Sequence, residues 1–334
     1  MGGEPRPLRV GIVGCGLVGR KRAAALEPGA LVASHDIDAE SSARLAAEFG
    51  GQACLTLDEL LSLRPDVVVV ATVHDQLAAI ASRALRAGAH VLVEKPGGIG
   101  VAEIDQVAAT ARAADRLVKV GFNHRFYPGI ARAIREAGSG AYGDVLYLRA
   151  WYGHGGRPGY EREWRADPRR SGGGEIVDQG MHLLDLSYWL LGDLPLHSAL
   201  LRTQFWRAPV DDNAVLVLGL PGGVGDNSPF ALFHVSWTDW KNTFALEIAC
   251  HDAKFAVDGL VRSYGPQVLR IFRMRPELGP PDLEIERYPD TDVSWELEWR
   301  HFAAAIAAND GRDLLGDLAS ARYAWSCLEA ARHE

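Results

Sequence analysis

The sequence predicts an α/β protein: a doubly wound parallel sheet in its first part, followed by an α+β domain. Three observations lead to this fold class. Short apolar runs alternate with helical segments through the first third of the chain, a glycine-rich turn follows the first run, and strand-like segments become closely spaced after about residue 123. Buried runs separated by amphipathic helices are what a parallel sheet covered on both faces requires. Closely spaced, alternating strands favour an antiparallel or mixed sheet.

The first domain is expected at residues 1–123. Its helices include Leu17–Leu26, Leu77–Ala87 and Val101–Ala114, where apolar residues recur at helical spacing. Apolar runs bounded by turn residues predict its strands. These strands are Leu8–Val13, Leu31–Ser34, Val67–Ala71, His90–Val93 and Leu117–Gly121.

The second domain is expected at residues 124–334, with an open-faced, mostly antiparallel sheet. A helix is predicted at Pro128–Ala137, and a strand opens after Gly143. Helices at Ser294–Ala308 and Leu314–Ala331 have apolar residues at helical spacing and are expected to pack back on the body. The remaining predicted strands are Asn213–Leu220, Phe230–Trp237, Phe244–Cys250, Lys254–Val257, Val268–Phe272 and Leu283–Tyr288.

Composition excludes some partners and suggests a compartment. The 334 residues carry 43 acidic and 35 basic side chains, a formal net charge of −8, which argues against a nucleic-acid partner. The first residues lack the apolar stretch of a secretion signal, and no apolar run is long enough to cross a bilayer. The four cysteines lie far apart with no CxxC pair, so neither a zinc site nor a disulfide framework is expected. We therefore expect a cytoplasmic protein.

A glycine motif predicts a dinucleotide site. It follows an apolar strand, opens the first helix, and reads Gly14-Cys15-Gly16-Leu17-Val18-Gly19. The first glycine permits a tight turn, the second lets the backbone approach a pyrophosphate, and the third allows close helix packing. Asp36 lies 22 residues beyond the first glycine, where a carboxylate can accept hydrogen bonds from an adenosine ribose and repels a 2′-phosphate. The motif therefore predicts NAD as the cofactor; a glycine turn without a ligand is the alternative.

Asp178, His182 and Asp185 are spaced by four and then three residues, which places them on one face of an α-helix. A carboxylate one turn from a histidine can fix its tautomer and raise its basicity, so this face is a candidate acid/base centre. A solvated polar stripe and a divalent-metal site are the alternatives that the spacing leaves open. We predict no metal.

The sequence Glu94-Lys95-Pro96 follows a predicted strand at the edge where doubly wound sheets bind their ligands. Lys95 would then face the nicotinamide. A surface turn is the alternative for a lysine followed by proline.

Together these motifs resemble the glucose-fructose oxidoreductase, inositol dehydrogenase and rhizopine catabolism (Gfo/Idh/MocA) family of two-domain dehydrogenases, across almost the whole chain. The resemblance rests on the glycine motif, Ala71-Thr72, Glu94-Lys95-Pro96, Gly121-Phe-Asn123-His-Arg125, Trp164-Arg165, and Gly172-Gly-Gly followed by Asp178, Gly180, His182 and Asp185. The chain departs from the usual pattern at Arg22, Val73 and Leu77.

The resemblance implies a Rossmann domain followed by an open-faced sheet that mediates a homo-dimer or homo-tetramer. It also implies that Lys95, Asp178 and His182 are catalytic. In the expected mechanism, His182 removes the hydroxyl proton of a sugar-type substrate, Asp178 orients the imidazole, and Lys95 stabilises the alkoxide. The expected activity is NAD-dependent oxidation of a secondary hydroxyl of a sugar, sugar nucleotide, aminoglycoside or cyclitol, with antibiotic-sugar biosynthesis as the context that composition suggests.

Two sets of further site residues complete the expectation. The cofactor set is Gly14, Cys15, Gly16, Leu17, Val18, Asp36, Thr72, His74, Glu94, Lys95, Pro96, Asn123, Trp164 and Arg165. The substrate set is Lys95, Arg125, Tyr152, His154, Tyr160, Asp178 and His182. The alternatives are an NAD(P)H-dependent ketosugar reductase, a non-catalytic regulator that binds dinucleotide and sugar, and a metal-dependent lyase or hydrolase.

Overall fold

The computed structural model describes residues 7–220 and 222–332, which form two compact units. The first unit comprises the described residues up to 122 together with 295–322, and the second comprises 123–294 together with the described residues from 323. Residues 295–322 therefore belong with the first unit, although the sequence placed them in the second domain. The expectation about a leader segment concerns residues 1–6, which lie outside the described residues.

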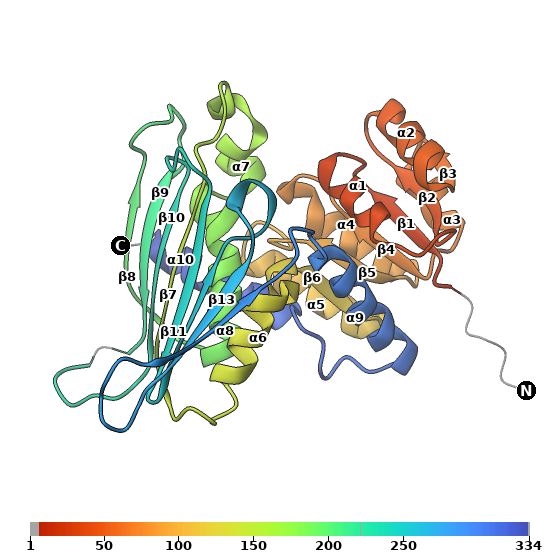
Figure 1. Ribbon diagram of the computed structural model, residues 1–334. Coiled ribbons are helices and arrows are strands. Elements are labelled where there is room, and N and C mark those ends of the chain that lie inside the picture. Colours follow the sequence, from red (N-terminus) through yellow and green to blue (C-terminus); the bar gives the residue numbers. More distant parts are fainter. Residues whose placement is uncertain (1–6, 221, 333–334) are drawn as a thin grey trace, which may run out of the picture. The chain divides into compact units, whose positions relative to one another are not determined.

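A six-stranded parallel sheet forms the centre of the first unit, in the order β3-β2-β1-β4-β5-β6 (Figure 1). Strand β4 consists of four valines that are at most 1% exposed, because helices cover both faces of the sheet. Strand β3 was not predicted, since it has only three residues and two of them are exposed. The strands are β1 Val10–Val13, β2 Leu31–His35, β3 Gln52–Cys54, β4 Val67–Val70, β5 His90–Glu94 and β6 Val118–Gly121.

The helices of this unit lie mostly where the apolar periodicity predicts them. Helix α9, Ser294–Ala308, contributes Trp299 and Phe302 to the apolar core around β1 and β4. This burial explains why its residues from 295 belong to the first unit. The preceding helices are α1 Leu17–Ala24, α2 Ala39–Phe49, α3 Leu57–Ser62, α4 His74–Arg86 and α5 Val101–Ala114.

An eight-stranded sheet dominates the second unit, in the order β14-β13-β12-β11-β7-β10-β9-β8. Strands β7 and β10 are parallel, and every other neighbouring pair is antiparallel. Strand β8 was not predicted; it lies at the sheet edge and is partly exposed along its length. The strands are β7 Val145–Gly153, β8 Leu196–Arg202, β9 Asn213–Leu218, β10 Phe230–Ser236, β11 Thr243–Cys250, β12 Ala253–Asp258, β13 Val268–Arg273 and β14 Asp282–Arg287.

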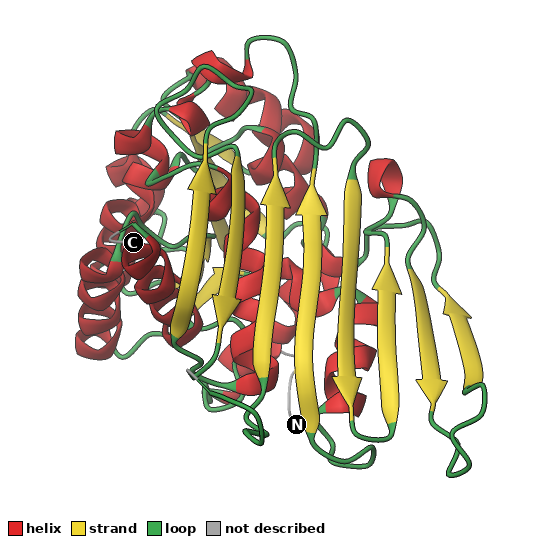
Figure 2. Ribbon diagram, turned by 90° about the vertical axis from the view of Figure 1, so that its left-hand side faces the viewer, coloured by secondary structure: helices red, strands yellow, loops and turns green. Residues whose placement is uncertain are grey.

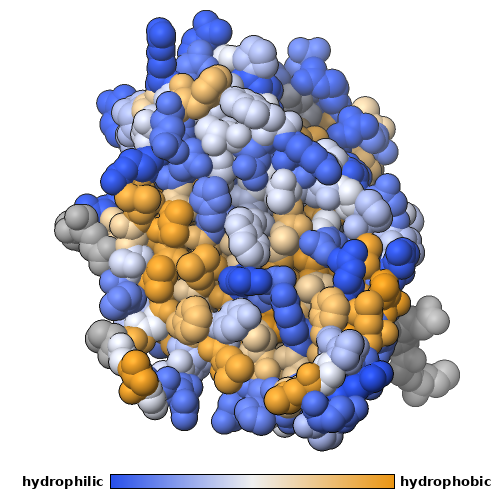
Figure 3. Space-filling view, turned by 60° about the vertical axis from the view of Figure 1, so that its left-hand side comes forward, coloured by the Kyte–Doolittle hydropathy of each residue, from blue (hydrophilic) through white to orange (hydrophobic). Residues whose placement is uncertain are grey.

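Helices cover one face of this sheet. Helix α6, Pro128–Ala137, packs on β11, β12 and β13. The π-helical segment Ile176–Gly180, which directly precedes α8, packs on β7, β9 and β10. Figure 2 looks onto the opposite face, and in Figure 3 apolar side chains gather over much of the surface turned to the viewer. The other helical segments are Asn123–Phe126, Tyr160–Arg162, Trp164–Ala166, α7 Pro168–Ser171, Ile176–Gly180, α8 Met181–Leu191, Arg262–Tyr264 and α10 Leu318–Ala331.

Among the helices of the described ranges, none combines the length and apolar character that a membrane span requires.

Candidate active site

The glycine loop has the backbone that dinucleotide binding needs. Gly14 has a φ of +92°, and a Cβ there would lie 2.4 Å from the Ala71 carbonyl oxygen. A Cβ at Gly19 would lie 1.9 Å from the Gly14 carbonyl oxygen, so the helix packs directly on the turn. A Cβ at Gly16 would meet nothing within 4 Å. The loop is thus closed on its inner side and open above Gly16, as a phosphate approaching the helix N-terminus requires.

Asp36 is held in place by the same loop. Its carboxylate accepts hydrogen bonds from the backbone N–H groups of Cys15, at 2.6 Å, and Asp38, at 2.9 Å. Each carboxylate oxygen keeps acceptor capacity for a further donor. The carboxylate is therefore oriented beside the glycine loop and can receive ribose hydroxyls there. Cys15 is chemically quiet, because burial and the nearby Asp36 raise the pKa of its thiol to about 12.

The loop after β4 contributes Thr72 and His74. The Thr72 hydroxyl donates to the Val73 carbonyl oxygen at 3.3 Å, while its side chain stays partly exposed. His74 begins α4 and is 6% exposed. Thr72 thus remains available to a ligand at this sheet edge, whereas the ring of His74 is largely enclosed by protein.

Glu94 takes part in a buried charge cluster. Arg22, from α1, donates through Nε to the Glu94 carboxylate and through Nη1 to Glu298, both at 2.5 Å. Lys119 Nζ lies 3.3 Å from Glu298, and the Trp295 ring lies beneath the Arg22 guanidinium. Burial raises the pKa of Glu94, and Arg22 opposes that rise. Glu94, predicted as a cofactor contact, is thus a structural partner of Arg22, and Lys95 follows it directly at the carboxyl end of β5.

A π-helical turn precedes the predicted acid/base helix. Residues Ile176–Gly180 are π-helical, and α8 begins at Met181, so Asp178 lies in the widened turn and His182 in the first α-turn. Asp211 holds the start of this segment, because its carboxylate accepts from the N–H groups of Gly174 and Ile176. No sequence motif points to Asp211, which is 35 residues away along the chain from Ile176. Single π-turns recur at functional sites.

Asp178 faces a cation. Its carboxylate lies 3.6 Å from Arg165 Nε, and the Arg165 guanidinium also lies 3.5 Å from Glu163 and stacks on the Trp164 ring. Trp164 and Arg165, predicted as cofactor contacts, belong to the second unit, where Arg165 balances part of the charge of Asp178.

The His182 ring is buried and stacked. It is 6% exposed, and its centroid lies 3.7 Å from that of His124, with 25° between the ring planes. Tyr152 approaches both rings from the side. Asn123, predicted as a cofactor contact, donates to Ser294 and lies beside His124.

Asp185, the third residue of the predicted helix face, pairs with an arginine from an earlier segment of the chain. Its carboxylate accepts two hydrogen bonds from Arg125, at 2.8 and 2.7 Å, and both side chains are at most 4% exposed. Arg125 also lies over the Trp189 ring. Asp185 and Arg125, the latter predicted to bind substrate, are thus engaged together in a buried ion pair.

The predicted aromatic residues divide into two groups. Tyr160 is 4% exposed and packs with Trp206, Val210 and Trp237, so it supports the loop and does not present a surface to a sugar. Tyr152 remains beside the two histidine rings. Burial raises its pKa well above the ordinary value, which keeps its hydroxyl neutral.

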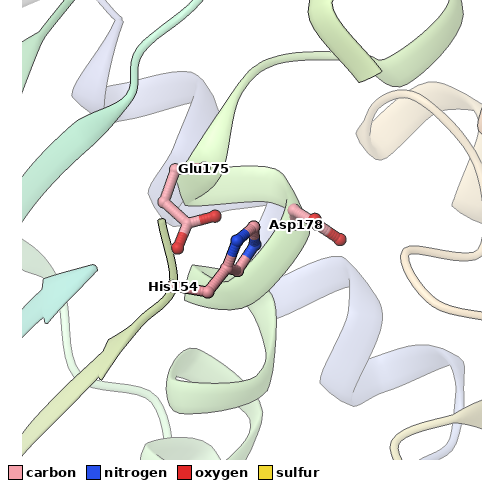
Figure 4. A group of neighbouring side chains, drawn as sticks. All are labelled: His154, Glu175 and Asp178. Carbon is pink, nitrogen blue, oxygen red and sulfur yellow. The ribbon is translucent and has the colours of Figure 1, made fainter. Parts of the chain in front are cut away.

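His154, Glu175 and Asp178 form a cluster in which one ligand atom of each lies within 4.8 Å of the others (Figure 4). Such a set can hold a metal ion. However, the Gly156 N–H donates to His154 Nδ1 at 2.9 Å, so a neutral ring carries its hydrogen on Nε2. Neither ring nitrogen then offers a free lone pair to a metal without a change in this hydrogen bond. The prediction of no metal stays a prediction.

Comparison with known proteins gives the family. A model described as "Oxidoreductase family, NAD-binding Rossmann fold" matches residues 8–122, and one for the GFO/IDH/MocA C-terminal domain matches residues 130–256. The dTDP-3,4-didehydro-2,6-dideoxy-alpha-D-glucose 3-reductase of Streptomyces violaceoruber is 34% identical over 71% of this chain and 70% of that protein. Levoglucosan dehydrogenase of Pseudarthrobacter phenanthrenivorans is 28% identical over 66% of this chain and 61% of that protein. The chain thus spans less than two thirds of the length of the latter relative.

Solved structures agree on the fold. UDP-N-acetylglucosamine 3-dehydrogenase from Acidithiobacillus ferrooxidans matches with a TM-score of 0.80 and 24% identity, over 98% of both chains. A levoglucosan dehydrogenase in complex with NADH and levoglucosan matches with a TM-score of 0.84 and 19% identity, also over 98% of both. Because the family models cover parts of both units and the Streptomyces violaceoruber relative aligns over more than two thirds of each protein, this chain belongs to the Gfo/Idh/MocA oxidoreductase family, whose first domain is described as an NAD-binding Rossmann fold.

Proposed function

We propose that this protein oxidises a secondary hydroxyl of a sugar, sugar nucleotide, aminoglycoside or cyclitol to a ketone, with NAD as the hydride acceptor. The observation that carries the proposal is the presence, in one chain, of two chemically distinct sets. The first unit has the glycine loop with the oriented Asp36, and Lys95 directly after β5. The second unit has Asp178 in the π-turn and His182 in the first turn of α8.

The residues present fit the cofactor. The open space above Gly16 accommodates a pyrophosphate, and the carboxylate of Asp36 accepts ribose hydroxyls while it repels a 2′-phosphate. Residues Gly14 to Val18, Thr72, Lys95 and Pro96 complete the proposed contacts. When bound, NAD supplies the electron-deficient carbon that takes the hydride; the protein supplies binding, orientation and proton transfer.

The proposed chemistry uses three side chains. His182 takes the hydroxyl proton as the C–H bond gives up its hydride, so the carbinol becomes a ketone and the imidazole becomes an imidazolium. Asp178, itself partly balanced by Arg165, lies one turn before His182 and favours that positive charge. Lys95 offers an ammonium group that stabilises the developing alkoxide. His154 and Tyr152 are the proposed substrate contacts that the second unit keeps close to this helix.

The test is a panel of free sugars, cyclitols, nucleotide sugars and aminoglycosides, with NADH formation as the readout. Turnover with one substrate class, absent in His182→Ala, supports the dehydrogenase. NAD binding without turnover in either direction would point to the non-catalytic regulator.

A ketosugar reductase is the second candidate, because the Streptomyces violaceoruber relative is named as a 3-reductase. The same groups can return a proton to the carbonyl oxygen. The panel is therefore also run with NADH and NADPH and the corresponding ketones, and the ratio of forward to reverse kcat/KM decides between the two directions.

We also propose that a second copy of this chain covers the open face of the eight-stranded sheet, as a homo-dimer or homo-tetramer. Apolar side chains gather on the face shown in Figure 3. Leu200, Phe230, Leu283 and Ile285, on β8, β10 and β14, are each 45–51% exposed. A soluble monomer rarely leaves a large apolar patch open. Light scattering on the purified protein and on Phe230→Glu tests this assembly. The four free, buried cysteines support the proposed cytoplasmic location.

A further inference from the structure

The stacked rings of His124 and His182 are joined to a chain of hydrogen bonds. Asn123 Nδ2 donates to Ser294 Oγ at 2.9 Å, and Ser294 Oγ donates to the Asp292 carboxylate at 2.6 Å. Because its amide nitrogen is the donor, Asn123 offers Oδ1 as an acceptor, and that oxygen lies 3.2 Å from His124 Nδ1. His124 therefore carries a hydrogen on Nδ1 and donates it to Asn123.

The direction of this chain has an electrostatic consequence. Each donor in the series His124, Asn123, Ser294 passes its hydrogen toward the next group, and the series ends on the negative charge of Asp292. Hydrogen bonds in series polarise one another, so electron density rises on the His124 ring. The ring face that His182 contacts is thus the face of an electron-rich imidazole.

Besides His182, three uncharged aromatic side chains lie close to the His124 ring. Tyr152, Tyr127 and Phe244 surround His124. Burial raises the pKa of Tyr127 and of Tyr152, so both stay uncharged through neutral pH. The other titratable groups around Tyr152 are Tyr264, whose pKa burial also raises, and the carboxylates Asp178 and Glu175.

We propose that His124 is a positioning residue that stabilises the imidazolium formed on His182 during turnover. The proposal rests on the proposed function, in which His182 accepts the substrate proton. A cation over an electron-rich ring is attracted by the ring face, and more strongly when water is excluded. Both rings are at most 6% exposed. The Asp292 relay fixes the plane of His124, so His124 holds the plane of His182 as well.

Two matched variants distinguish the effect of the aromatic ring face of His124 from the effect of its side-chain volume. His124→Phe keeps an aromatic face without the relay, and His124→Leu keeps bulk without a face. We expect kcat to fall about tenfold in His124→Leu and only a few-fold in His124→Phe, with KM for NAD unchanged in both. Without this stabilisation the His182 imidazolium loses its proton more easily. The acid limb of the pH profile of kcat therefore moves to lower pH, by about half a pH unit in His124→Leu. Asp292→Asn, which weakens the relay but leaves the stack, should shift the limb in the same direction by a smaller amount.

Titration of the His182 ring protons by NMR makes the test independent of turnover. The midpoint should be lower in His124→Leu than in the wild type, and intermediate in Asp292→Asn. Equal midpoints and equal kcat in wild type and His124→Leu would overturn the proposal, as would an equal loss in His124→Phe and His124→Leu. If the wild type proves inactive on every substrate, the proposed function fails while the NMR comparison still decides the role of His124.

Discussion

Arg22 and Glu94 form a buried ion pair that joins the first helix after the glycine loop to the end of β5. The Arg22 guanidinium is 2% exposed, reaches Glu94 with one nitrogen and Glu298 with another, and lies over the Trp295 ring. The sequence showed Arg22 only as a departure from the family pattern. The structure makes it the centre of the charge cluster that holds the residue preceding Lys95.

Replacing Arg22 with leucine should destabilise the first unit strongly. The change leaves Glu94 and Glu298 as buried carboxylates without their main partner, and breaking such a pair lowers the free energy of unfolding by about 3–5 kcal/mol. Burial raises the folded-state pKa of Glu94, and loss of Arg22 raises it further. The loss of unfolding free energy in Arg22→Leu relative to the wild type should therefore grow as pH rises above the ordinary pKa of a carboxyl group.

Urea unfolding of Arg22→Leu and of Arg20→Leu measures this effect. Arg20 lies on the same helix, but its side chain is 62% exposed and pairs with Glu48 at the surface. The control should change the free energy of unfolding by about 0–1 kcal/mol. Equal losses in the two variants would argue against a structural role for the Arg22 cluster.

Asp36 should decide the choice of cofactor. In Asp36→Ser the ribose hydroxyls lose a charged acceptor, and a 2′-phosphate meets no repulsion. Hydrogen bonds to charged groups contribute about 1.5–3 kcal/mol, so NAD affinity should fall by about ten- to a hundredfold, while NADP binds relatively better. Asp38→Ser, at the cap of α2, is the control and should leave the preference intact. Calorimetric titration gives the dissociation constants for NAD and NADP. An unchanged ratio of the two constants in Asp36→Ser would contradict the assignment of Asp36 as the ribose acceptor.

The cysteines should resist alkylation in the folded protein. Burial raises the pKa of the Cys15 thiol to about 12 and that of Cys250 and Cys327 to about 11, and it raises the pKa of Cys54 as well. The thiolate is the reactive form, so labelling by iodoacetamide at about pH 8 should be slow and should accelerate as pH rises toward these values. Mass spectrometry with and without urea measures the extent of labelling at each cysteine. Rapid native labelling at Cys15 would show that the glycine loop opens.

Chelators should leave the activity unchanged. The hydrogen on His154 Nε2, which follows from the Gly156 bond to Nδ1, leaves neither ring nitrogen of His154 ready to bind a metal beside Glu175 and Asp178. Dialysis against EDTA followed by assay and elemental analysis checks this expectation. A loss of turnover that a divalent cation restores would establish the metal-dependent alternative.

Periodicity predicted most of the fold, including the bounds of α5, α6 and α9. The missed strands β3 and β8 are exposed segments, one very short and one at a sheet edge, and neither carries a continuous apolar run. The assignment of α9 to the second domain was wrong beyond Ser294, because the amphipathic pattern shows that a helix has an apolar face but not which core receives it.

The sequence predicts the motifs of the candidate site but not which side chains pair with one another. The spacing of Asp178, His182 and Asp185 predicts one helix face. In the structure Asp178 lies in the π-turn, His182 and Asp185 lie in α8, and Arg125, 60 residues before Asp185, pairs with its carboxylate. Tyr160 resembles a sugar-stacking residue in sequence, but tertiary packing buries it. Asp211 holds the start of the π-turn from a segment that is distant in sequence, so no local pattern points to it. The motif Asn123-His-Arg125 likewise does not show that the His124 ring stacks on His182.

The most direct test of the account is the fate of the hydride. The best substrate of the panel, labelled with deuterium on the carbon to be oxidised, is incubated with NAD and the purified protein, and the reduced cofactor is analysed by mass spectrometry. We expect the label to appear in NADH, and we expect His182→Ala and Lys95→Ala to abolish its transfer while both variants still bind NAD. Oxidation without label in the cofactor, or full transfer by His182→Ala, would contradict it.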